Sequence, residues 1–126
     1  NDCFLEGENH VEPEEYEKNL ESILSQSFET NGELKVFLMA VLSADKGQIQ
    51  GEENTCREEI GRYSQICRRI AEKDDRIFFI QLQHLFDEAA EGRDCAYWIW
   101  DGIHPTESGH ALIAREWIKA FKAMFE

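Results

Sequence analysis

The sequence predicts an α/β fold built on a parallel sheet. Two apolar runs of strand length, residues 34–42 (LKVFLMAVL) and 76–82 (RIFFIQL), contain few polar residues. A segment with helical periodicity separates them, and strands that alternate with helices pair in parallel. Nearly continuous apolar runs are typical of strands that helices bury on both faces.

Helices are expected on both sides of these strands. The first covers about 13–29, where apolar residues recur at helical spacing. The second covers about 53–74 and carries charged residues opposite its apolar face. A short helix is expected at 85–90 and a long one at about 106–125, where Thr106 is a suitable N-cap.

Composition limits the classes of partner. The chain has 126 residues, with 13 Lys and Arg against 26 Asp and Glu, so its formal net charge is -13. Polyanions such as nucleic acids are therefore repelled. No apolar run approaches the roughly 20 residues of a membrane span, and no signal-peptide pattern opens the chain. We expect a soluble chain that binds neither nucleic acid nor membranes.

The four cysteines do not form a metal-binding pattern, because no CxxC pair and no suitably spaced His occurs among them. Cys56 and Cys67 fall on one expected helix, roughly 16 Å apart, which is too far for a disulfide. Free thiols are favoured over a disulfide framework, and they indicate a reducing, cytoplasmic location. No metal site is expected.

Two strands do not make a complete sheet of this type, since each would keep an unpaired edge. The sequence also begins at Asn1 and Asp2, without Met or a turn signal. We therefore expect residues 1–126 to be the C-terminal part of a single domain. The missing N-terminal part would be two or three strand-helix units, roughly 60 to 90 residues.

Asp101 and His104 form the sharpest chemical motif, Asp-Gly-Ile-His-Pro, in the loop before the last helix. An Asp-x-x-His pair can place a carboxylate on one imidazole nitrogen and leave the other as a general base. Pro105 disfavours a helical conformation at His104, and open α/β sheets place their sites beyond the carboxyl ends of strands. The alternative is that Asp101 is only a turn residue and His104 only packs near the helix.

This motif, continued by Thr106 and by Gly109-His110, resembles the last conserved block of the SGNH (GDSL-like) hydrolases. That family includes lysophospholipase-like and carbohydrate esterases. The opening Asn1-Asp2 is similar to the end of another block of the family, Gly-x-Asn-Asp. The resemblance covers essentially the whole chain. It implies a three-layer, flavodoxin-like fold, represented here only by its C-terminal strand-helix units.

The resemblance also implies roles for individual residues. Asp101 and His104 would complete a Ser-His-Asp triad, and Asn1 would donate a hydrogen bond to the oxyanion. No cofactor is implied. From their chemistry, Trp98 and Trp100 could bind substrate by stacking on an acyl or sugar group, with packing of the loop as the alternative.

The nucleophile is the departure from the family pattern. In the family it is a Ser in a Gly-Asp-Ser block near the N-terminus, and none of the six serines lies in such a context. The complete protein would hydrolyse acyl or acetyl esters, including those of carbohydrates, whereas this chain alone would be inactive. Its partners would be a small ester and the missing N-terminal segment. Two alternatives stay open: Cys3 as the nucleophile, or an inactive α/β fragment that serves as a binding module.

Overall fold

The fold alternates helices and strands, as the sequence predicts. The computed structural model describes residues 9–40, 42–44, 51 and 53–125. The elements in chain order are α1 (Pro13–Thr30), β1 (Val36–Met39), α2 (Glu53–Lys73), β2 (Ile77–Ile80), α3 (Gln83–Glu91), the 3₁₀-helix η2 (Cys95–Tyr97) and α4 (Glu107–Phe125). Every helix expected from the sequence is present, within two residues at each end.

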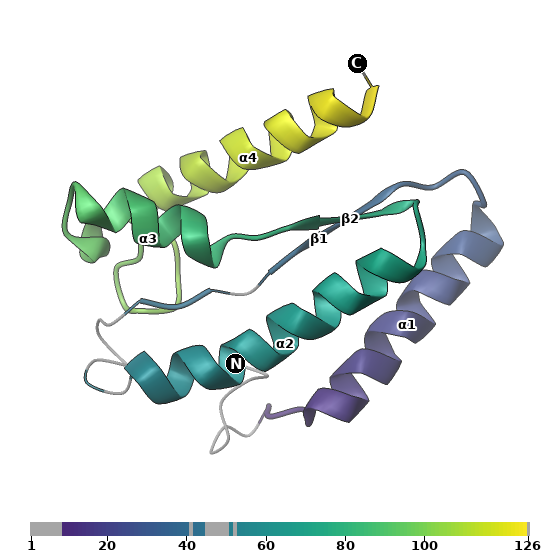
Figure 1. Cartoon of the computed structure of the whole chain (residues 1–126), viewed down its shortest axis with the longest axis horizontal. Coiled ribbons are helices and arrows are strands. Elements are labelled where there is room, and N and C mark those ends of the chain that lie inside the picture. Colours follow the sequence, from purple (N-terminus) through teal and green to yellow (C-terminus); the bar gives the residue numbers. More distant parts are fainter. Residues whose placement is uncertain (1–8, 41, 45–50, 52, 126) are drawn as a thin grey trace.

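The elements form three layers. Strands β1 and β2 pair in parallel, in a register that runs from Val36 opposite Ile77 to Met39 opposite Ile80. Helix α2 connects the strands and packs on both, with α1 against it. Helix α4 lies on the other side of the sheet (Figure 1). The predicted α/β class with a parallel sheet is therefore confirmed.

Both strands are shorter than the apolar runs that predicted them, at four residues each. The ladder ends where the Ala40 amide donates to the Ile80 carbonyl at 3.0 Å, because the chain then turns into α3 at Gln83. The expectation that both strands are buried on both faces is wrong for β1 within the described residues. Its first three residues are half-buried, and Met39 is 45% exposed.

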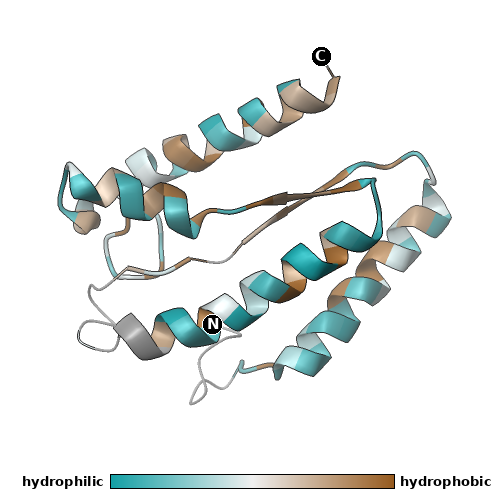
Figure 2. Ribbon diagram, viewed as in Figure 1, coloured by the Kyte–Doolittle hydropathy of each residue, from teal (hydrophilic) through white to brown (hydrophobic). Residues whose placement is uncertain are grey.

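Two apolar clusters hold the layers together. One joins α1, α2 and β2 through the buried side chains of Leu24, Ile66, Ile70 and Ile77. The other lies beside the carboxyl ends of the strands and is formed by Ala44, Phe86, Ile99 and Leu112. In Figure 2 the strands are mainly brown, whereas α1 and α2 carry both teal and brown residues, as expected of amphipathic helices that cover a sheet. The second cluster supports the loop before α4.

Helix α4 keeps an apolar stripe in contact with solvent. Its exposed members are Trp117, Ile118, Phe121 and Phe125. The Trp117 ring contacts Phe37 of β1, with 5.5 Å between ring centroids, so the stripe continues onto the sheet. Among the described residues, no helix combines the length and the apolar character needed to cross a membrane.

Candidate active site

The loop that connects η2 to α4 is closed on itself by backbone contacts. Ile99 and Pro105 form an isolated antiparallel bridge, and the Trp100 amide donates to the His104 carbonyl at 3.3 Å. The loop lies at the end of the sheet where β1 and β2 finish, beside α3 (Figure 1). This is the edge at which open parallel sheets carry their sites.

Asp101 organises the turn inside this loop. Its Oδ1 accepts the backbone amides of Ile103 at 3.0 Å and of His104 at 2.7 Å. Its Oδ2 lies 2.7 Å from Nδ1 of His104. Gly102, between them in sequence, has a φ of 93°, a left-handed conformation that glycine adopts without strain. The structure thus brings together the Asp and His that the sequence singled out.

The electrostatics of the pair follow from its burial. The Asp101 side chain is only 7% exposed, whereas that of His104 is 57% exposed. Burial would raise the pKa of Asp101, but the hydrogen bonds from His104 and Ile103 outweigh it and lower that pKa to about 2. An ionised carboxylate only accepts hydrogen bonds, so Nδ1 of His104 carries the proton. Nε2 is then free to accept a proton from another group.

The start of α4 fixes the far end of the loop. Thr106 is the N-cap, as predicted, because its Oγ1 accepts the Gly109 amide at 3.2 Å, and the same hydroxyl donates to the Tyr97 carbonyl at 2.6 Å. Gly109 allows a close approach, since a Cβ there would lie 2.2 Å from the Trp98 carbonyl oxygen. The sequence marked Gly109 only as part of a motif and gave no steric reason for it.

The two tryptophans of the loop differ in their surroundings. Trp98 is half-buried against the second apolar cluster, and its Nε1 donates to the Ala89 carbonyl of α3 at 3.1 Å. Trp100 is 61% exposed and stacks on His104, with 6.4 Å between ring centroids. Trp98 is thus engaged in packing, and Trp100 is the tryptophan whose surface is open to a ligand.

The other candidates lie elsewhere. Asn1 and Cys3 fall outside the described residues. Ser22, Ser25 and Ser27 lie on α1, Ser64 on α2 and Ser108 in the first turn of α4. Ser43 is buried, and the side chain of Gln83 binds its backbone, a contact that the sequence did not suggest. In the described ranges, no three His, Cys, Asp or Glu side chains gather as a metal-binding group.

Comparison with known proteins identifies the family. A sequence model of the GDSL-like lipase/acylhydrolase family matches residues 1–112. An acetylxylan esterase from Geobacillus stearothermophilus is 27% identical over 113 residues, which are 89% of this chain and 48% of that protein. The chain therefore spans about half the length of this relative.

Solved structures agree with this relationship. The crystal structure of the acetylxylan esterase Axe2 from Geobacillus stearothermophilus matches with a TM-score of 0.72 and 26% identity, over 91% of this chain and 49% of that one. An alpha/beta hydrolase enzyme from the metagenome of Lake Arreo, Spain, matches with a TM-score of 0.73 and 29% identity, over 92% and 50%.

Variants of Axe2 have also been solved. Two are catalytic mutants, one with a His replaced by Ala and one with an Asp, three positions earlier, replaced by Ala. A third has Ile in place of the Trp that directly precedes this Asp. The family match over residues 1–112 and these structures show that the chain belongs to the GDSL-like lipase/acylhydrolase family.

Proposed function

We propose that the full-length protein is a serine esterase in which this chain supplies the His and the Asp of the triad. The observation that carries the proposal is the 2.7 Å contact between a buried Asp101 carboxylate and Nδ1 of an exposed His104. This arrangement fixes the tautomer in which Nε2 is a general base.

The variants of Axe2 support these roles. Its two catalytic mutants alter an Asp and a His with the spacing of Asp101 and His104, and its Trp variant corresponds in position to Trp100. The family match includes this loop, because it spans residues 1–112.

In the proposed reaction, Nε2 of His104 takes the proton of a serine hydroxyl as its oxygen attacks the ester carbonyl. The tetrahedral intermediate then collapses, and the alcohol leaves with that proton. Water hydrolyses the acyl-enzyme by the same steps. Asp101 stabilises the imidazolium in both halves. Asn1 is proposed to donate its side-chain amide to the oxyanion.

The nucleophilic serine is proposed to come from an N-terminal segment that completes the same domain. Two features support this. The chain covers only about half of its relatives, and the apolar stripe on α4 is exposed, as expected of a surface that another part of the domain covers. On this basis the 126-residue chain by itself is inactive.

The proposed substrates are small esters, with acetylated carbohydrates first among them. The acetylxylan esterases among the relatives support this class. Trp100 offers an exposed aromatic face beside His104, on which a sugar ring can stack.

Hydrolysis of p-nitrophenyl acetate and acetylated xylo-oligosaccharides by the full-length protein tests the proposal. His104→Ala should lower kcat/KM by about 10³-fold or more. His84→Ala is the matched control, because His84 is exposed on α3 and pairs with Glu88. Turnover retained in His104→Ala would refute the assignment. A wild-type protein that binds these esters without turning them over would indicate an inactive binding module instead.

A further inference from the structure

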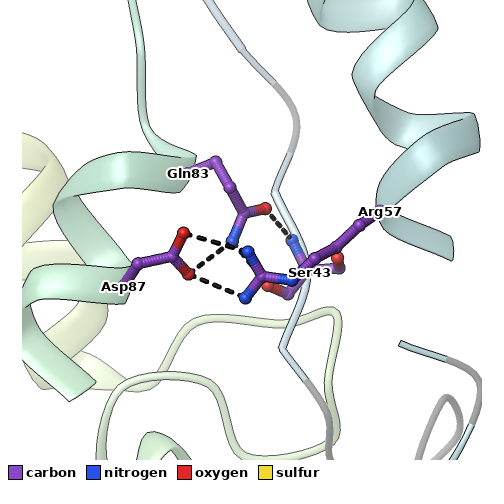
Figure 3. Close-up of polar contacts among 4 residues, drawn as sticks. All are labelled: Ser43, Arg57, Gln83 and Asp87. Atoms are coloured by element: carbon purple, nitrogen blue, oxygen red, sulfur yellow. Dashed lines mark hydrogen bonds and ion pairs between the residues drawn. The ribbon is translucent and has the colours of Figure 1, made fainter. Parts of the chain in front are cut away.

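A side chain, and not a neighbouring strand, binds the backbone of the segment that follows β1, which includes Ser43 and Ala44. Beyond Ile80, β2 no longer runs beside it, because the chain enters α3. The Ser43 amide donates to Oε1 of Gln83 at 3.0 Å, and Nε2 of Gln83 donates to the Ser43 carbonyl at 2.9 Å (Figure 3). One side-chain amide thus makes both hydrogen bonds that a neighbouring strand would make.

This segment also contacts the loop that connects η2 to α4 and carries Asp101 and His104, here called the catalytic loop. The amide of Ala44, the next residue, donates to the Gly102 carbonyl at 3.0 Å. Ser43, Ala44 and Gly102 are all buried, so water does not compete for these contacts. The Gly102 carbonyl and the Ile103 amide belong to one peptide group, and that amide donates to Oδ1 of Asp101 at 3.0 Å, so the contact from Ala44 fixes the peptide that orients the carboxylate. The side chains of Gln83 and Asp101 are therefore connected through hydrogen bonds of the backbone between them.

Gln83 has only one orientation that satisfies its amide. Its Nε2 also donates to Oδ1 of Asp87 at 3.0 Å. Arg57 of α2 binds the same carboxylate through two hydrogen bonds, of 2.9 and 2.8 Å (Figure 3). Burial would raise the pKa of Asp87, but the hydrogen bonds from Arg57 and Gln83 lower it, so it remains an ionised acceptor. Rotating the amide would turn Oε1 toward this carboxylate.

Apolar packing does not immobilise the segment on every side. A cavity of about 320 Å³ lies between α3 and the catalytic loop, and its lining includes Ser43, Asp87 and Ile99. Atoms that border a cavity lack packing partners there. The position of the segment therefore depends on its hydrogen bonds more than that of a fully packed chain would.

We propose that Gln83 is a positioning residue for the Asp101–His104 pair. It acts through the backbone of Ser43 and Ala44 on the Gly102 carbonyl, and does not touch substrate. The inference rests on the proposed esterase function for its kinetic consequences, but its structural part can be measured separately.

The kinetic test uses the full-length protein with Gln83→Leu, which keeps the size of the side chain and removes its hydrogen bonds. With active sites counted by a serine-directed phosphonate, kcat per site for p-nitrophenyl acetate should fall at least tenfold, while KM stays within twofold. Gln81→Leu, the same change at an exposed residue two positions earlier, should leave both unchanged. An unchanged kcat per site in Gln83→Leu would overturn the proposal.

A second variant decides the matter if Gln83→Leu does not fold. Gln83→Glu keeps an acceptor for the Ser43 amide but, when ionised, has no donor for the Ser43 carbonyl and faces the Asp87 carboxylate. We expect kcat per site to fall at least tenfold here as well. Wild-type kcat in folded Gln83→Glu would contradict the proposal.

A spectroscopic measurement separates this inference from the proposed function. The Nδ1 proton of His104, bonded to Asp101, should give a downfield imidazole resonance in the proton NMR spectrum that is absent in His104→Ala. In Gln83→Leu this resonance should shift and broaden, and in Gln81→Leu it should not. If the wild-type protein shows no esterase activity, the proposed function fails, yet an unperturbed resonance in folded Gln83→Leu would still refute the positioning role.

Discussion

Oδ2 of Asp101 lies 2.7 Å from Nδ1 of His104, while Oδ1 of the same carboxylate accepts two backbone amides of the turn between them. One carboxylate therefore both shapes the loop and orients the imidazole. Because the two oxygens have separate partners, a substitution can remove the second task and keep the first.

Asp101→Asn is that substitution. Its Oδ1 can still accept the amides of Ile103 and His104, so the turn should persist. Its Nδ2 would donate to Nδ1 of His104, which places the imidazole proton on Nε2 and removes the general base. We expect kcat to fall by about 10³- to 10⁴-fold in the full-length protein, with the thermal midpoint little changed. A variant that keeps more than a tenth of the wild-type kcat would contradict the role of Asp101.

The stability of the protein should also depend on Asp101 in acid. Its pKa is lowered from an ordinary value of 3.8 to about 2. The stabilisation from this group is complete above the unfolded value and is lost as the pH falls from about 4 to about 2. Asp74, whose pKa the hydrogen bonds from Arg76 also lower to about 2, contributes over the same range.

The measurement therefore compares two proteins. Urea unfolding of wild type and Asp101→Asn between pH 5 and 2 should show a smaller loss of unfolding free energy in the variant, because the contribution of Asp101 is then absent while those of Asp74 and Asp87 remain. Equal losses would show that Asp101 has no depressed pKa in the folded state.

Gly109 and Gly61 form a matched pair of helical glycines. A Cβ at Gly109 would lie 2.2 Å from the Trp98 carbonyl and 2.9 Å from Cβ of Pro105, whereas a Cβ at Gly61 would meet no atom within 4 Å. Gly109→Ala should lower the free energy of unfolding by about 1–3 kcal/mol and reduce esterase activity, because α4 must move off the loop. Gly61→Ala should raise that free energy by about 0.5–1 kcal/mol. Denaturant unfolding of both variants checks this, and equal effects would exclude the close approach.

Replacing Trp98 should lower the stability of the protein, whereas replacing Trp100 should weaken substrate binding. Trp98→Ala removes a side chain packed on α3 and should cost about 3 kcal/mol of stability. Trp100→Ala removes an exposed ring and should change stability by about 0.5 kcal/mol or less. For acetylated xylo-oligosaccharides its KM should rise about 2- to 10-fold, the range of one stacking contact. An unchanged KM for these sugars would remove Trp100 from the substrate site.

The features that could be predicted from sequence are those with local causes. The order of helices and strands follows from apolar periodicity, and the Asp101–His104 contact follows from a spacing of three residues across a turn. The contacts that could not be predicted join distant segments. Gln83 and Ser43 are 40 residues apart and meet only once β2 has ended and α3 has begun.

The tryptophans show the same limit. The sequence predicts both Trp98 and Trp100 as substrate-binding residues, because both are aromatic and lie next to the motif. Their difference arises from η2, after which Trp98 has helical backbone angles and its indole reaches the Ala89 carbonyl on α3. That contact depends on where α3 packs, which no local pattern specifies.

The most direct test of the account is to find which residue a serine-directed phosphonate modifies in the full-length protein, by mass spectrometry, in wild type and His104→Ala. We predict a single labelled serine outside the 126 residues of this chain, and a labelling rate at least about 10³-fold lower in His104→Ala. Labelling of a serine within this chain, or an equal rate in the two proteins, would contradict a triad completed by Asp101 and His104.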